Sequence, residues 1–305
     1  MFVASAGESE SVLPLTLGRV FSAWSFDPWT LCVLVLVAAL YVAGVLRLRR
    51  RGDRWSLWRL LSFCGAGLGA LVLATCSSLA TYDGTLLSMH VVQHMVLSVV
   101  APVFLALGAP VTLGLRTLPT GARRLLLAVL HSRLARVVTF PPLAFTLFIV
   151  SPWALYFSGW YEATLRSAVL HALLHLHFVV VGCLFFWPLL GLDPVPGKVA
   201  YPFRVLTIFA TLPFHAFLGV TIMGMDQLIA ADWYLSLGRQ WSPSPLEDQQ
   251  IAGGILWGSG DLVGLAIFGV LFVQWVRESG REAAREDRRL DREEAREAAG
   301  GNITA

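Results

Sequence analysis

The histidines of this sequence include two pairs with the same spacing. His90 and His94 lie in "SMHVVQHMVL", and His171 and His175 lie in "LHALLHLH". A spacing of four places both imidazoles of a pair on one face of a helix, one turn apart. Two neutral ring nitrogens on adjacent turns can share a coordination sphere, which a second helix can complete. The pairs therefore predict a metal centre, although imidazoles also exchange protons near neutral pH.

Thioether side chains lie near these histidines in the sequence. Met89 and Met95 flank the first pair, and Met223 and Met225 follow His215 within one apolar stretch. Imidazole suits copper, zinc, iron and nickel, whereas thioethers favour Cu(I). Copper, as Cu(I), is therefore the predicted metal. The further candidate ligands are His215, Met89, Met95 and Met223.

The segment "EDQQIAGGILWGSGDL" places an acid inside the last apolar stretch, at Asp261. A carboxylate about 15 Å into a membrane helix is costly, so we expect Asp261 to pair with a histidine or a metal, or to carry protons. Small residues permit close approach of membrane helices. The glycines expected to do so here are Gly253, Gly254, Gly258 and Gly260.

The elements that must position these residues are membrane helices. Of the 305 residues, 56% are hydrophobic and 14% are charged, and the mean hydropathy is +0.67, well above that of a soluble domain. A helix needs about 20 apolar residues to cross the hydrocarbon. Continuous apolar stretches, rather than alternating ones, predict helices and not barrel strands. We therefore expect an all-α integral membrane protein, a bundle of seven transmembrane helices. The stretches are 29–46, 57–80, 86–107, 137–157, 164–190, 205–225 and 251–276.

The basic residues predict how the bundle lies in the membrane. With the N-terminus outside and the C-terminus in the cytoplasm, 20 of the 23 lysines and arginines fall on the inner side, as the positive-inside rule requires. We expect an extracytoplasmic tail at 1–28, a seven-helix membrane domain at 29–276 and a charged cytoplasmic tail at 277–305. The two histidine pairs and His215 then lie roughly 6 to 16 Å below the outer surface. Polar side chains at such depths normally face the bundle interior, so we expect three helices to bring these imidazoles to one site.

Two charged segments fall on the predicted inner side. Residues 123–136 alternate leucines with basic residues and are expected to lie along the membrane interface. The tail alternates arginines with acids at helical spacings, such as Arg289 and Glu293, and predicts a solvated helix that continues the last span. A docking site for a partner is the alternative interpretation of the tail.

The remaining polarizable side chains are expected to pack rather than to react. Cys32, Cys64, Cys76 and Cys183 occur singly, without a Cys-x-x-Cys motif, which does not support a thiolate zinc site or a redox pair. Cys32 and Cys76 lie toward the outer ends of their helices and could approach one another. His177 points about 200° away from His175 around its helix, and we expect it to be a hydrogen-bonded packing residue.

Three stretches together resemble a known family. "MHVVQHMVLSVVAPVFLALGAP", "LHALLHLHFVVVGCLFFWPLLGLDP" and "EDQQIAGGILW" are similar to the membrane-bound CtaG-type cytochrome c oxidase assembly factors of Gram-positive bacteria, in the form found in actinobacteria, and the similarity covers roughly residues 25–295. The resemblance implies a role in maturing a haem–copper oxidase, in copper handling at the centre that faces the outer side. On this basis His90, His94, His171 and His175 are expected at a metal site, and Asp248 joins them as the acid of the third motif.

The expected function is that of a metallochaperone and not of an enzyme. It would reside in the plasma membrane of a bacterium, bind copper in the outer half of the membrane and pass it to a cytochrome c oxidase subunit. Besides that subunit and the lipid bilayer, an extracytoplasmic copper donor is a candidate partner, whereas nucleic acid is not.

Two other functions remain open. The first alternative is a protein that binds haem b in membrane electron transfer, with axial histidines from two facing helices, such as His94 and His175. A proton or metal transporter that uses the histidines and Asp261 is less favoured, because the inner halves of the predicted helices are almost wholly apolar.

Overall fold

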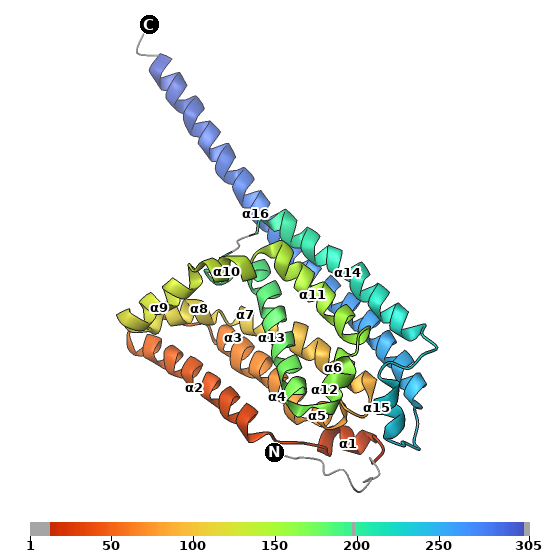
Figure 1. Cartoon of the computed structure of the whole chain (residues 1–305). Coiled ribbons are helices and arrows are strands. Elements are labelled where there is room, and N and C mark those ends of the chain that lie inside the picture. The colour runs from red at the N-terminus through yellow and green to blue at the C-terminus, as the bar shows by residue number, and fades with distance from the viewer. Residues whose placement is uncertain (1–12, 197–198, 302–305) are drawn as a thin grey trace.

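The computed structural model describes residues 13–196 and 199–301, and in this part of the chain every regular element is a helix. Figure 1 shows a bundle from which the C-terminal helix projects far beyond the other elements. The predicted all-α fold is confirmed. The predicted tail at 1–28 falls partly on residues 1–12, which lie outside the described residues.

The elements follow one another along the chain as a series of long helices with short helices between them. The first half comprises α1 (Leu17–Ser22), α2 (Pro28–Arg50), α3 (Leu57–Leu60), η1 (Leu61–Gly67), α4 (Leu68–Cys76), α5 (Ser78–Tyr82), α6 (Leu87–Met95), η2 (Val96–Val100), α7 (Ala101–Leu107), α8 (Pro110–Thr117), α9 (Thr120–Leu130) and α10 (Arg133–Val138). The second half comprises α11 (Pro141–Tyr156), α12 (Trp160–Arg166), α13 (Ala168–Leu190), α14 (Tyr201–Met223), α15 (Ala231–Ser236) and α16 (Pro245–Gly301).

Six helical segments of the described residues are long and apolar enough to cross a membrane, or up to seven if α11 and α12 together form one span. The stretch predicted at 86–107 coincides with α6, η2 and α7. The π-helix η2 directly precedes α7, whose first turn contains Pro102. The predicted number of seven spans thus depends on the fourth. Large apolar side chains exposed on these helices, such as Phe217 and Leu262, are those expected to face lipid.

The fourth and fifth predicted stretches differ from the helices observed. α11 has 16 residues and begins at Pro141, and after Tyr156 the chain bends by 72° into α12. Thr164, predicted to open the fifth span, belongs to α12. α13 starts only at Ala168, because the Ser167 hydroxyl accepts a hydrogen bond from the Leu170 amide and caps a new helix there. Apolar composition does not reveal such a break.

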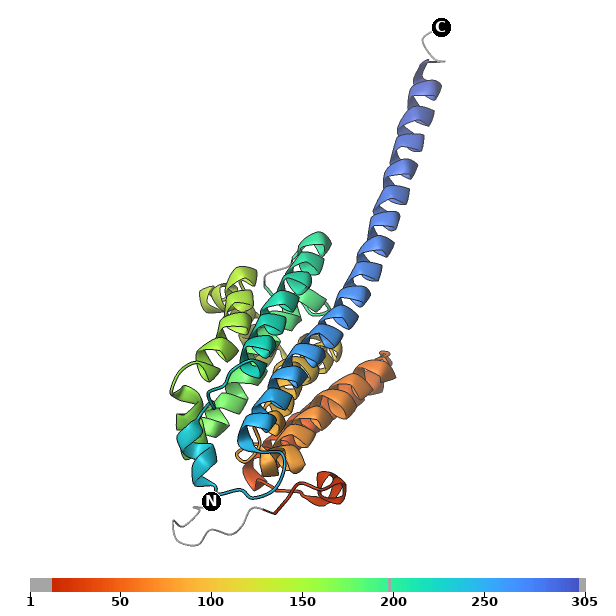
Figure 2. The ribbon, with the colours of Figure 1, turned by 90° about the vertical axis from the view of Figure 1, so that its right-hand side faces the viewer.

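The short helices lie at opposite ends of the bundle. In Figure 1, α1, α5, α12 and α15 lie at one end, and α9 and α10 lie toward the other, from which the tail of α16 projects. The predicted topology requires this arrangement, while the assignment of the outer side stays a prediction from the basic residues. Figure 2 shows α14 beside the membrane part of α16 along its length.

The charged tail is helical as predicted, as far as the structure describes it. α16 continues without interruption from its apolar part to Gly301, and residues 302–305 of the predicted tail lie outside the described residues. Arg289 lies 3.8 Å from Glu293, the pair expected from the spacing, and also contacts Glu286. These exposed pairs each contribute little stability. The segment predicted to follow the interface is likewise helical, as α9 and α10.

Candidate metal centre

Three donor side chains meet where α13 passes the turn before α6. Asp83 lies in that turn, directly after α5, and His171 and His175 lie in the first two turns of α13. The ligand atoms of these three residues all lie within 4.8 Å of one another. The His171 and His175 rings are perpendicular, with centroids 4.5 Å apart. The i, i+4 pair of α13 therefore forms a shared site, as the spacing predicted.

Hydrogen bonds hold this cluster together. His171 Nε2 lies 3.0 Å from Asp83 Oδ2, and His175 Nε2 lies 3.9 Å from the same oxygen. Gln93 donates from Nε2 to the Ala74 carbonyl at 2.8 Å and to Asp83 Oδ2 at 3.0 Å. The amide orientation is thereby fixed, so Gln93 Oε1 accepts a hydrogen bond from His175 Nε2 at 2.9 Å. Both Nε2 atoms thus carry hydrogen in this structure.

His90 stands beside the cluster without a hydrogen-bond partner. The side chain is fully buried, and neither ring nitrogen has a partner among the described residues. The ring centroid lies 6.1 Å from that of His171 and 4.9 Å from that of Tyr161. A buried polar group without a partner costs about 1 to 3 kcal/mol, so a water molecule or another ligand bonded to His90 would stabilise the fold.

Tyr161, on α12, links this region to the short helix α15. Its hydroxyl lies 2.6 Å from the hydroxyl of Tyr234, on α15, and both side chains are buried. Burial raises the pKa of Tyr234 far above its usual value, so the phenol stays protonated. The pair therefore closes the cluster on the side of Tyr161 with neutral groups.

The other two predicted histidines lie in separate surroundings. The Nδ1 atom of His94 lies 3.2 Å from the Tyr156 hydroxyl, and its ring stacks on Phe178 with centroids 4.0 Å apart. The ring of His215 lies 5.4 Å from that of Phe148. The structure thus brings together three of the five predicted imidazoles, those of His90, His171 and His175, and leaves His94 and His215 outside their cluster.

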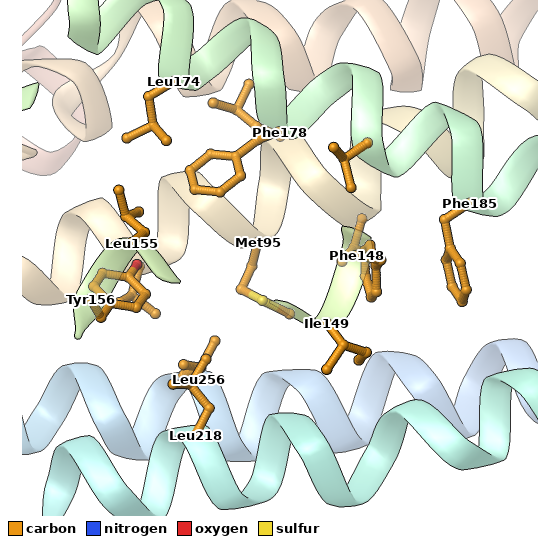
Figure 3. Packing of buried hydrophobic residues seen from close by; sticks show 14 of the residues in the cluster. Met95, Phe148, Ile149, Leu155, Tyr156, Leu174, Phe178, Phe185, Leu218 and Leu256 are labelled. Carbon is orange, nitrogen blue, oxygen red and sulfur yellow. The ribbon is translucent and has the colours of Figure 1, made fainter. Parts of the chain in front are cut away.

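The predicted methionine ligands are distributed among several environments. Met89 is half-buried directly before His90 on α6. Met95 is buried in the apolar core, where Figure 3 shows it among Phe148, Ile149 and Phe178. Met223 packs at the contact between α14 and α16, against Gly253. The cluster of Asp83, His171 and His175 is accordingly built from nitrogen and oxygen donors.

The two predicted acids also differ in their surroundings. Asp248 is buried at the start of α16, where Oδ2 accepts from the Leu87 amide at 2.6 Å and Oδ1 accepts from the Ser88 hydroxyl. Asp261 has one carboxylate oxygen buried without a partner. Asp248 therefore caps the N-terminus of α6 and so positions the helix that carries His90.

Replacement of Asp248 by alanine is expected to destabilise the protein by about 2 kcal/mol, because it leaves buried amides of α6 without an acceptor. The copper stoichiometry of the folded fraction should stay unchanged. Thermal unfolding in detergent and elemental analysis measure the two effects, with the exposed neighbour Gln250→Ala as control. Loss of metal without loss of stability would instead make Asp248 a ligand.

Sequence reasoning missed two members of the cluster, Asp83 and Gln93. Gln93 stands inside the motif "MHVVQHM", and Asp83 lies in the turn that precedes the helix of His90. Gln93 could have been predicted, because it is a polar amide between two histidines of an otherwise apolar helix. Asp83 could not, because acids are common in turns, where they are usually solvated.

The residues expected to pack differ in burial: Cys76 is buried, whereas Cys32 and His177 are exposed. The Nε2 atom of His177 lies 2.9 Å from the Ser151 hydroxyl, which confirms a hydrogen-bonded histidine away from the cluster. All four cysteines are free, with Cys32 exposed and Cys76 buried, so these two do not form a disulfide.

Fold and site together define an all-helical protein with six or seven helices apolar enough to span a membrane and a partly buried histidine–aspartate cluster near one end of the bundle. A family model described as cytochrome c oxidase caa3 assembly factor matches residues 39–278, and the chain belongs to this family. Membership confirms the resemblance seen in the three sequence motifs.

Curated relatives of the chain come from mycobacteria. Proteins of Mycobacterium bovis and Mycobacterium tuberculosis, both described as uncharacterized, are each 39% identical over 277 residues, which is 88% of this chain and 42% of theirs. An uncharacterized protein of Mycobacterium leprae is 36% identical over the same length. The chain therefore spans less than half of the length of the curated relatives it matches, namely 42%. No solved structure matches it.

Proposed function

We propose that the protein binds copper at the cluster of Asp83, His171, His175 and His90, and delivers it to a cytochrome c oxidase subunit during assembly of that enzyme. The family supports the assembly role. The observation that carries the copper proposal is a set of three donors within 4.8 Å of one another, beside a buried histidine with two unpartnered nitrogens. Copper is here a cargo and not the cofactor of a reaction, so we expect no enzymatic activity.

The donor set suits a first-row transition metal. Imidazole nitrogens bind copper, zinc, iron and nickel well, and copper lies at the top of the affinity order of divalent ions. A single carboxylate leaves a bound divalent ion with a net positive charge. This favours release of the ion to a recipient site with more negative charge. Because this cluster contains no thioether, it fits Cu(II) as well as Cu(I).

Access to the cluster is graded. The side chains of His171 and His175 are 17% and 18% exposed, and that of Asp83 is 12% exposed. His90 is fully buried behind them. We infer that an ion first binds the partly exposed residues and that His90 then completes its coordination. The ion leaves by the same route to a partner at the outer surface. An extracytoplasmic copper donor would use this face.

Copper binding is expected to weaken as the pH falls, because protons compete with copper for the ring nitrogens of His171 and His175. At neutral rings the hydrogen that Nε2 gives to Asp83 or Gln93 moves to Nδ1 when Nε2 coordinates the ion, so no net proton is released. Titrations with copper at several pH values measure the affinity. An affinity that does not change between about pH 7 and the range in which free imidazole is protonated would contradict coordination through these atoms.

Elemental analysis of the full chain, purified in detergent and loaded with copper, tests the proposal. We expect about one ion at the cluster in the wild type and its loss in the double variant His171→Ala and His175→Ala. His177→Ala is a matched control, because it removes a histidine of the same helix that pairs with Ser151 instead. Cytochrome c oxidase activity of membranes from the same strains should fall only with the double variant. Unchanged copper stoichiometry in that variant would refute the proposal.

The packing of the helices argues against the haem alternative. The candidate axial ligand His94 is stacked on Phe178. A Cβ added to Gly182, on α13, would collide with the Ser98 carbonyl on η2, so the two helices touch at their backbones. A macrocycle between His94 and His175 would have to separate these helices. An absorption spectrum of the purified protein without a Soret band is the expected result.

A further inference from the structure

A small, partly enclosed cavity lies in the core, apart from the histidine–aspartate cluster. Its volume is about 20 Å³, and its walls come from α6, η2, α11, α13, α14 and α16. Most of its wall is apolar, and the side chains that could donate to a ligand are those of Met95, Thr211 and His215. A cavity of this volume holds one water molecule or one ion and nothing larger. Figure 3 shows that Met95 projects from its own helix into the space between that helix and the pair α14 and α16.

The imidazole of His215 is poised to accept a ligand in this cavity. The side chain is 7% exposed. Its Nδ1 atom lies 3.4 Å from the carbonyl of Thr211, one turn earlier on α14, which favours the tautomer with hydrogen on Nδ1 and a free lone pair on Nε2. Thr211 gives its own hydroxyl hydrogen to the Ile208 carbonyl. Nε2 is therefore the strongest donor atom left for the cavity.

An uncompensated acid lies next to this histidine. Gly260 packs on His215 so closely that an added Cβ would lie 3.0 Å from the Cβ of His215, and Asp261 follows directly. One oxygen of Asp261 is buried without a partner, and none of the ion pairs among the described residues includes this carboxylate. Asp261 is also one of the charges that act on His215. A carboxylate at membrane depth requires a compensating positive charge.

We propose that this cavity is a second metal site, which binds Cu(I) through Met95 and His215 with Asp261 as the compensating charge. Thioether and imidazole together select Cu(I) among the available ions, and a monovalent cation leaves the site neutral with one carboxylate. Water would satisfy the imidazole but not the charge. This inference rests on the proposed copper function. It adds a buried site with a thioether ligand to the partly exposed site of Asp83, His171 and His175, which has only nitrogen and oxygen donors.

The two sites differ in accessibility as well as in donors. The side chains of His171 and His175 in the histidine–aspartate cluster are 17% and 18% exposed, whereas Met95 and His215, which line the cavity, are 6% and 7% exposed. We therefore expect an ion in the cavity to exchange more slowly than an ion at the histidine–aspartate cluster, the outer of the two sites. Transfer between the sites would pass along α6, which carries both His90 and Met95.

Anaerobic loading of the full chain with Cu(I), followed by removal of weakly bound ion, tests the inference. We expect two ions per chain in the wild type, one of them with a sulfur ligand in the X-ray absorption spectrum. Met95→Leu should lose the sulfur signal and one ion, and His215→Gln should lose the same ion. Met225→Leu is the matched control, because Met225 packs against the apolar core outside the cavity.

The outcomes separate this inference from the proposed function. The double variant of His171 and His175 should lose one ion while the sulfur signal stays. A wild-type protein with one ion and no sulfur ligand, lost only in that double variant, would overturn the second site and leave the outer site intact. If Met95→Leu loses both ions and circular dichroism shows that it is unfolded, His215→Gln decides the question. For the inference to hold, His215→Gln must lose the sulfur-ligated ion alone.

Discussion

Replacement of His90 by leucine is expected to stabilise the metal-free protein by about 1 kcal/mol and to weaken copper binding at the outer cluster by about 100-fold or more. The two effects have opposite signs because His90 has no partner in the absence of a metal. Its buried nitrogens lower the stability of the fold, and a leucine of similar volume removes that cost.

Opposite signs distinguish a ligand from a packing residue. A histidine that only fills space would lose favourable contacts on replacement, here those with Tyr161 and Tyr156, and stability would fall with no specific effect on copper. His94 provides that comparison, because its ring is hydrogen-bonded to Tyr156 and stacked on Phe178. We expect His94→Leu to destabilise the protein by about 1 to 2 kcal/mol and to leave the outer copper site in place.

Thermal unfolding of both variants in detergent, without and with copper, measures these effects. For His90→Leu the midpoint of the metal-free protein should rise by about 2 °C, and the increase that copper causes in the wild type should disappear. A lower midpoint for His90→Leu, with copper binding retained, would show that His90 is a packing residue and that the ion is held by the other three side chains alone.

The fold was predictable where apolar composition alone decides it. The helical stretch predicted at 86–107 coincides with α6, η2 and α7, since continuous apolar residues favour helix, although the candidate span itself extends to Thr117. The break at Ser167 was not predictable, because it depends on one hydroxyl that caps α13. The bend after Tyr156 falls in the interval predicted between the stretches 137–157 and 164–190, but the sequence did not predict that the short helix α12 occupies this interval.

The candidate site was predictable only in part, for a different reason. Spacing fixed which histidines of one helix share a face, and the pair of α13 does form one site. Spacing cannot determine how α6 is rotated relative to α13, and this rotation directs His90 toward the cluster and His94 toward Phe178. Asp83 contributes through a contact 88 residues away in sequence, with His171, which no local pattern reveals.

Close contact between α14 and α16 supports the inner cavity, and it depends on two glycines that face each other. A Cβ on Gly253 would lie 2.6 Å from the Gly219 carbonyl oxygen, and a Cβ on Gly219 would lie 2.6 Å from the Gly253 carbonyl oxygen. Both obstacles are backbone atoms of rigid helices, so they cannot give way as a side chain would. Gly254 and Gly258, predicted from the sequence to serve the same contact, face open space instead.

Gly253→Val is therefore expected to destabilise the protein by about 3 kcal/mol, because the two helices must separate to accommodate the side chain. Gly254→Val, one residue along the same helix, should change the stability by less than about 0.5 kcal/mol. Thermal unfolding of the two variants in detergent gives the comparison, with copper loading measured on the folded fraction. Since separation of α14 from α16 also opens the cavity at His215, the folded fraction of Gly253→Val should lose the sulfur-ligated ion and keep the ion of the outer cluster. Equal stability of the two variants would mean that the helices do not meet at Gly253, and the arrangement of α14 and α16 around the cavity would then be wrong.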